Sequence, residues 1–181
     1  MGNARRVYGT IAGLALALFM GGAGMVAAQG LPGGATSLNE THGDWTVACA
    51  TREGVARCVI TQTQVSGENR QRVLAVELTA AEGGNTVNGV LVLPFGLRLD
   101  SGVRLAIDEA APREPLRFST CLPAGCLVPL AFDTASVTAL RVGTALRVTA
   151  TTSDSTQEVA FSISLSGFTS ALDRVNELGS R

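Results

Sequence analysis

The stretch Trp45–Val65, WTVACATREGVARCVITQTQV, decides the fold that this sequence predicts. Its first five residues alternate apolar and polar side chains, and the part from Val55 onward partly does so. Such alternation is typical of a half-buried β-strand. Between the two halves, Thr51–Gly54 (TREG) has the composition of a turn. The stretch is therefore predicted to form a β-hairpin with Cys49 and Cys58 at its facing ends.

Further short β-type runs follow the hairpin, separated by turn signals. They are Val73–Leu78, Val87–Leu93, Val103–Ile107, Cys126–Phe132, Ala145–Thr151 and Glu158–Leu165. A series of short strands with turns between them indicates an antiparallel all-β domain, of the β-sandwich type. Pro129 suits an edge strand or a bulge, because proline cannot donate a ladder hydrogen bond.

Two segments have helical rather than strand spacing. Thr134–Leu140 is predicted to be a short helix, N-capped near Asp133 and closed at Gly143. Gly167–Leu178 carries its apolar residues on one helical face, which should dock on the sheet. The predicted fold class is an all-β, antiparallel β-sandwich-like domain with a short C-terminal helix and two local disulfides.

The N-terminal part of the chain has the features of a secretory signal peptide. Arg5 and Arg6 precede an uncharged segment, Val7–Ala28, that is rich in Ala, Leu and Gly and ends in small residues. Residues 1–28 are predicted to be the signal peptide. The alternative is an uncleaved membrane anchor, because about 20 apolar residues can span a bilayer. Residues 29–42 are interpreted as a flexible lead-in, and residues 43–181 as a single β domain.

The charge of the chain argues against two classes of partner. The sequence has 181 residues with 15 acidic side chains and 14 arginines, and it contains no lysine. The arginines are scattered, so no basic stripe for nucleic acid is present. There is also no polybasic patch of the kind that binds a membrane surface. After signal cleavage, no membrane span and no nucleic-acid partner are expected.

Four cysteines in an exported chain form an even set in an oxidising compartment. Local pairing is predicted, Cys49 with Cys58 and Cys121 with Cys126, and the second pair flanks a Pro-Ala-Gly turn. Structural zinc is the first alternative, but the spacing does not match that of zinc ligands and the only histidine lies elsewhere. A catalytic dithiol is the second, but it typically has two intervening residues in a βαβ context. No metal or other cofactor is expected.

Catalytic residues are not predicted, although one alternative stays open. The only histidine, His42, lies in the polar lead-in, and no serine sits in a Gly-x-Ser-x-Gly elbow. Asp108 and Glu109 are adjacent, and Asp100 lies eight residues earlier. Paired carboxylates can run hydrolysis at the right separation. An envelope hydrolase that uses these acids is therefore the enzymatic alternative.

Six motifs, in this order, carry a resemblance to a known family. They are GDWTVAC (43–49), RCVITQ (57–62), LPFGLRL (93–99), GVRLAID (102–108), FSTCLPAGC (118–126) and SLSGF (164–168). The chain resembles the invasion-associated locus B family of exported proteins from Gram-negative bacteria, from Gly43 to about Leu178. The residues that recur in the family are architectural in type: Trp45, Cys49, Cys58, Pro94, Gly96, Cys121, Gly125 and Cys126.

The resemblance implies a location and a class of function, but no chemistry. Family members are small periplasmic or outer-membrane-associated proteins, and the founding member is linked to entry of an intracellular bacterium into host red cells. No catalytic residues define the family. The expected function is that of an exported, non-enzymatic envelope protein that binds an envelope or host-surface protein. A carrier of small apolar ligands inside a barrel is a further alternative.

Overall fold

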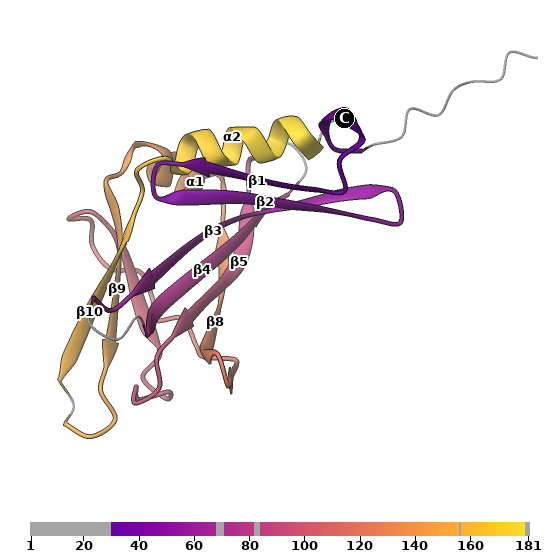
Figure 1. Ribbon diagram of the computed structural model, residues 1–181. Helices are drawn as coiled ribbons and strands as arrows, with labels where there is room; N and C mark the ends of the chain where they lie inside the picture. The colour runs from indigo at the N-terminus through magenta and orange to yellow at the C-terminus, as the bar shows by residue number, and fades with distance from the viewer. Residues whose placement is uncertain (1–29, 68–70, 82–83, 156, 180–181) are drawn as a thin grey trace, which may run out of the picture.

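A computed structural model describes residues 30–67, 71–81, 84–155 and 157–179. The predicted signal peptide, residues 1–28, lies outside the described residues. Figure 1 shows two antiparallel sheets and two helices. The all-β, sandwich-like fold with a C-terminal helix and two disulfides is confirmed.

The predicted hairpin is formed by β2 (Trp45–Arg52) and β3 (Val55–Val65). Glu53 and Gly54 form its two-residue turn and have positive φ angles of 52° and 79°. Turns with two positive φ angles match the right-handed twist of the flanking strands. Trp45, Val47 and Cys49 alternate inward along β2, and Trp45 is 1 % exposed.

Five further strands complete the large sheet, whose order is β1-β2-β3-β4-β5-β8-β7. They are β1 (Ser37–His42), β4 (Arg72–Ala80), β5 (Val87–Leu93), β7 (Thr120–Leu122) and β8 (Gly125–Phe132). Since β7 pairs with β8 only as far as Leu127, Pro129 lies beyond the end of β7 and costs no ladder hydrogen bond on that side. The edge position expected for Pro129 is thus explained by the shortness of β7.

One segment differs from the expectation of a flexible lead-in. Residues 37–42 form β1, which pairs with β2 along its whole length, and η1 (Pro32–Gly34) precedes it. The segment SLNETH carries only one aliphatic side chain, so it lacks the alternation that marks a half-buried strand. Pairing with β2 holds residues 37–42 in a strand conformation that their own composition does not predict.

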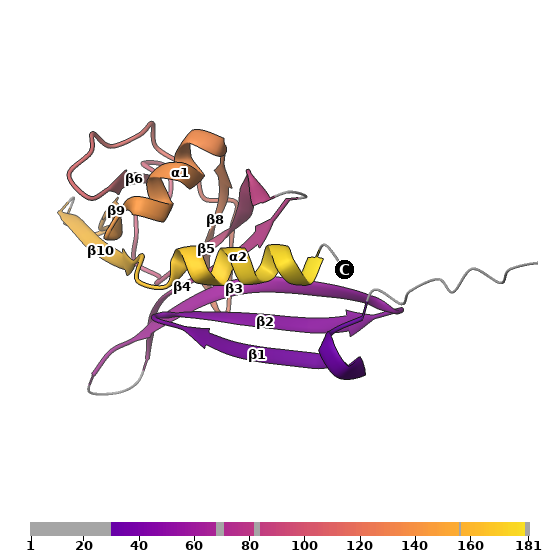
Figure 2. The same ribbon diagram turned by 90° about the horizontal axis from the view of Figure 1, so that it is seen from above.

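The small sheet has the order β10-β9-β6, and its buried residues belong to the same hydrophobic core as those of the large sheet. Its strands are β6 (Val103–Ile107), β9 (Ala145–Thr151) and β10 (Glu158–Ser164). The helices are α1 (Thr134–Val142), which precedes β9, and α2 (Phe168–Gly179), which follows β10. Figure 2 shows α2 lying along β2 and β3, and the apolar face of α2 is buried there.

The two sheets are joined by polar contacts from β2 and β3 to β10. The backbone carbonyl of Ser164 accepts hydrogen bonds from Trp45 Nε1 and Gln62 Nε2, each at 2.9 Å. Gln62 Oε1 accepts in return from the Ser164 N–H at 3.2 Å, and Gln62 is only 6 % exposed. Gln64 Nε2 donates to the carbonyl of Ser162 at 2.7 Å. Side-chain amides of β3 thus take the place of a neighbouring strand along part of the edge of β10.

Two glycines allow the chain to cross itself beside this joint. The turn after β1 contains Gly43, and the connection from β10 to α2 contains Gly167 with φ +87°. A Cβ atom on Gly167 would lie 1.9 Å from the carbonyl oxygen of His42. This close backbone contact places Phe168 against Trp45, with ring centroids 5.4 Å apart in an edge-to-face arrangement.

An ion pair fastens α2 to the edge strand β1. Arg174 donates from Nε and Nη2 to the two carboxylate oxygens of Glu40, at 2.7 and 2.8 Å. These hydrogen bonds lower the pKa of Glu40, and the same contacts raise the pKa of Arg174. His42 Nε2 lies 3.5 Å from the Glu40 carboxylate, on the same face of β1.

Replacing Gly167 with alanine should destabilise the fold strongly. Gly96 is the matched control, because its φ is +88° but nothing lies within 4 Å of the added Cβ. Gly96→Ala should cost about 1–2 kcal/mol from backbone strain alone. Gly167→Ala should cost clearly more, because the added carbon meets a backbone carbonyl. Chemical denaturation measures both, and equal losses would contradict the crossing contact.

The Glu40–Arg174 pair should make stability depend on acid pH. The pKa of Glu40 is lowered in the folded chain, so its contribution is present above the ordinary value of 4.5 and is lost as the pH falls through the lowered value. The stability difference between the wild type and Glu40→Gln should therefore shrink as the pH drops below 4.5. Thermal unfolding across that range measures it. A difference that stays constant would show that the ion pair does not stabilise the fold.

Candidate binding site

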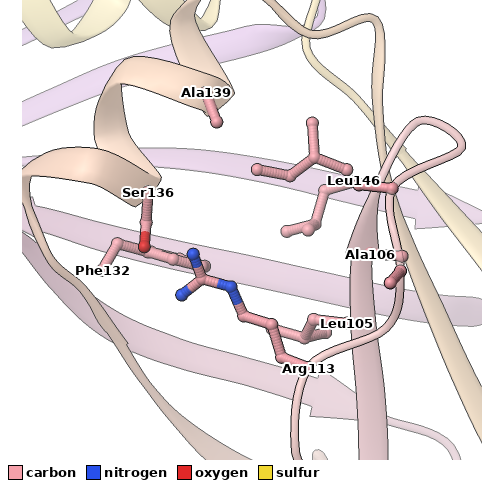
Figure 3. A pocket seen from close by; sticks show the side chains of 10 residues that line it. Leu105, Ala106, Arg113, Phe132, Ser136, Ala139 and Leu146 are labelled. Carbon is pink, nitrogen blue, oxygen red and sulfur yellow. The ribbon is translucent and has the colours of Figure 1, made fainter.

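An apolar cavity of about 130 Å³ opens at the surface between α1 and the small sheet. Figure 3 shows the Arg113 side chain extending across this cavity toward Ser136 of α1. Apart from these two residues, the lining is aliphatic or aromatic. It comprises Leu105, Ala106, Ile107, Ala110, Ala111, Phe132, Ala139 and Leu146.

The loop that follows β6 forms one wall of the cavity, and Asp108 holds it in place. The Asp108 carboxylate accepts hydrogen bonds from the backbone N–H groups of Thr144 and Ala145, at 2.9 to 3.1 Å. Asp108 has a positive φ of 51°, so the chain turns sharply here. The loop then returns along β6, where the Arg113 N–H donates to the carbonyl of Leu105 at 3.0 Å. This return places Arg113 at the mouth of the cavity.

Helix α1 forms the opposite wall, and its start is fixed by Asp133. The carboxylate accepts from the backbone N–H of Ser136 at 2.8 Å and also from the Ser136 hydroxyl, as an N-cap does. These hydrogen bonds lower the pKa of Asp133, and the nearby charge of Arg113 lowers it further. The predicted N-cap and the predicted end at Gly143 are both confirmed.

The three acids of the hydrolase alternative are not gathered into this cavity. Asp108 is engaged by backbone N–H groups, and Glu109 is 84 % exposed and pairs with Arg147 on the outer face of the small sheet. Asp100 lies in an exposed turn before β6. None of the three lines the cavity, and no pair of them shares a described hydrogen-bond network. Asp108 and Glu109 are adjacent in sequence but form no shared site, because the side chains of these two successive residues contact different partners.

The cysteines form the two predicted disulfides, Cys49–Cys58 and Cys121–Cys126. Each joins residues that lie directly opposite one another on paired antiparallel strands, with Cα atoms 4.1 and 3.9 Å apart. Every cysteine in the part of the chain that is described is thus oxidised, which leaves no thiolate ligand for zinc. The prediction of two structural disulfides is therefore confirmed.

Sequence reasoning did not identify the residues of the cavity. Arg113, Phe132, Ser136 and Leu146 come from separate segments and form no local motif. The nearest sequence signal is the Asp133 cap of α1, which marks where one wall begins. In the described ranges, no group of three or more His, Cys, Asp or Glu side chains could hold a metal ion. No helix in those ranges is long and apolar enough to cross a membrane.

Comparisons with known proteins agree on one family. The model of the invasion associated locus B (IalB) protein family matches residues 45–176. An invasion protein B homolog of Brucella abortus is 50% identical over 151 residues, covering 83% of this chain and 86% of that protein. Invasion protein B of Bartonella bacilliformis is 36% identical over 151 residues, covering 82% and 80%.

A solved structure supports the same relationship. The crystal structure of invasion associated protein b from Bartonella henselae superimposes with a TM-score of 0.74 at 34% identity. It covers 80% of this chain and 98% of that one. The described sheets and helices therefore form an arrangement already seen experimentally in a relative.

Asp108 should prove to be a structural residue. Asp108→Ala removes the acceptor for the N–H groups of Thr144 and Ala145, and we expect a loss of about 1–3 kcal/mol in the free energy of unfolding. Asp108→Asn should lose less, because its amide oxygen can still accept. Asp100→Ala, in an exposed turn, is the control and should change stability by less than about 0.5 kcal/mol. Unchanged stability of Asp108→Ala would argue for a chemical role instead.

Proposed function

Because the chain belongs to the invasion-associated locus B family, we propose that it is an exported, invasion-associated protein that acts by binding a protein partner. In this proposal it carries out no chemical step. The partner is a protein of the bacterial envelope or of a host-cell surface. The cavity between α1 and the small sheet receives one apolar side chain of that partner.

The size of the cavity is the observation that carries this proposal. Its volume is about 130 Å³, and an apolar cavity near 150 Å³ holds about one benzene ring. Sites for drug-sized ligands occupy roughly 300–1,000 Å³. The volume therefore fits a single leucine-sized or phenylalanine-sized anchor rather than a lipid or a cofactor. It does not favour the alternative of a small-ligand carrier.

Protein interfaces concentrate their free energy in such anchors. A few side chains that fill dry pockets dominate binding, while the surrounding contacts exclude water. The lining from Leu105, Phe132 and Leu146 would supply the dry pocket here. Arg113 is exposed at the mouth, so it would favour an anchor with an acidic neighbour in the partner sequence.

Export is part of the same proposal and is supported by the disulfides. Structural disulfides typically form and persist in an oxidising compartment such as the periplasm or the cell exterior. The family relatives carry the name invasion protein B, which suggests a role in invasion and a non-enzymatic protein. The proposal places the domain in the periplasm, on the outer membrane or outside the cell.

Filling the cavity should abolish partner capture. Ala139→Leu adds three carbon atoms to a lining position and keeps a good helix former. Val142→Leu is the matched control on the same helix, because Val142 is 83% exposed and lines no part of the cavity. A photo-crosslinker at Ala111, on the rim, reports the captured protein in cells or on host-cell surfaces. We expect Ala139→Leu to lower the crosslink yield at least tenfold, as the loss of an interface anchor does.

The outcome separates binding at the cavity from a loss of folding. Thermal unfolding of Ala139→Leu must match that of the control for the result to count as loss of the site. Equal crosslinking by a folded Ala139→Leu variant would place the partner elsewhere. Absence of any crosslinked protein in the wild type, from both the envelope and host cells, would contradict the proposed function.

A further inference from the structure

The two sheets have four edges, and the described residues protect three of them. A bare strand edge presents unpaired N–H and C=O groups, which can pair with another chain. At the end of the large sheet beyond β8, the edge strand β7 is only three residues long, and Pro129 interrupts the edge of β8 that β7 leaves uncovered. Both are devices that discourage pairing.

The edges of the small sheet are occupied by other parts of the chain. Along β6, Val103 exchanges two backbone hydrogen bonds with Leu116, at 2.9 and 2.8 Å. Along β10, the side-chain amides of Gln62 and Gln64 hydrogen-bond to Ser164 and Ser162. Only the charged end of β10, near Glu158, is left without such a partner among the described residues.

Among the described residues, the edge strand β1 has none of these protections. It is six residues long, it contains no proline and no lysine, and its register with β2 has no bulge. Figure 2 shows β1 at the margin of the large sheet, on the side away from β3. Glu40 carries the only carboxylate of β1, and it points inward to Arg174. An inward-pointing charge can discourage strand pairing, but the charge of Glu40 is compensated by the two hydrogen bonds from Arg174.

The hydrogen bonds of β1 show which of its backbone groups have no partner in the part of the chain that the structure describes. Thr51 N–H donates to the carbonyl of Thr36 at 2.9 Å, and the two residues lie opposite one another in the β1–β2 register. Leu38, Glu40 and His42 therefore have their backbone groups turned toward β2, because these alternate along an antiparallel strand. Ser37, Asn39 and Thr41 turn theirs outward, and all three residues are exposed.

We propose that β1 pairs with β1 of a second copy of this chain, in antiparallel register about a two-fold axis at Asn39. In this register Ser37 faces Thr41 of the other copy, and Asn39 faces Asn39. Each of these facing pairs exchanges two backbone hydrogen bonds, so the junction has six. The two large sheets then become one continuous sheet.

Two features favour a second copy over a foreign peptide. A peptide added to a sheet edge gains its specificity from pockets for alternate side chains. The side chains on the exposed face of β1 belong to Ser37, Asn39 and Thr41. These small polar side chains form no pocket for a peptide side chain. The two-fold register also brings Glu40 opposite Leu38 of the other copy rather than opposite a second Glu40. The strand is thus self-complementary, as a two-fold interface requires.

The interface would be small, so the dimer would be weak. A single pair of short strands falls below the roughly 1,200 Å² of stable complexes. We expect dissociation in the micromolar range or weaker. The pairing is independent of the cavity, because β1 and α1 contribute to different surfaces.

The experiment uses the full chain, expressed for export so that both disulfides form. Sedimentation from about 10 μM to about 1 mM should show reversible dimerisation, a range that covers free energies near −7 to −4 kcal/mol. Asn39→Pro should remain folded, because its N–H points away from β2, and should abolish the dimer. Asn39→Ala keeps the N–H and should retain dimerisation within about threefold.

Amide hydrogen exchange supplies an independent readout. The N–H groups of Ser37, Asn39 and Thr41 should become protected at high concentration in the wild type but not in Asn39→Pro. A wild type that stays monomeric up to about 1 mM would overturn the proposal. So would a dimer that Asn39→Pro leaves intact at matched thermal stability, since its contacts would then lie elsewhere.

Discussion

The backbone carbonyl of Ser164 is the constraint on which the rest of the structure depends. It accepts from both Trp45 and Gln62, and these two donors belong to neighbouring strands of the large sheet. Both donors are buried, and a buried polar group without a partner costs about 1–3 kcal/mol. The small sheet therefore has one favourable position against the large one. That position sets where α2 begins, and it sets where the wall of the cavity formed by β6 and β9 lies.

The joint brings together three of the separated motifs that carry the resemblance to this family. GDWTVAC contributes Gly43 and Trp45, RCVITQ contributes Gln62, and SLSGF contributes Ser164, Gly167 and Phe168. In the fold they meet through two hydrogen bonds to one carbonyl, an edge-to-face ring contact and a backbone crossing. The architectural character expected of Trp45 follows from these contacts.

Most of the fold could be predicted from sequence because its strands, helix caps and disulfides are determined by residues close together in the chain. Alternation predicted the strands, and cap residues predicted α1. The two disulfides followed from hairpins that close within 9 and 5 residues. The strand β1 could not be predicted, because its inward side chains include Glu40 and His42, and the partner of Glu40 is 134 residues away in α2. The cavity was missed for the same reason, since its walls come from segments that only the tertiary fold brings together. Asp108 and Glu109 resembled a carboxylate pair, but the turn directs one to the backbone and the other to Arg147.

The two disulfides have a further consequence for how the chain acquires its form. Each links residues that face one another only when the hairpin is in its native register. A slip of one residue would turn one sulfur to the opposite face of the sheet, because side chains alternate along a strand. Each disulfide can therefore form only in the native register. Oxidation selects this alignment of each hairpin over an alignment that is shifted by one residue. Because the two cysteines of each bond are close in sequence, each disulfide can form within its own hairpin before the distant strands of the small sheet have docked.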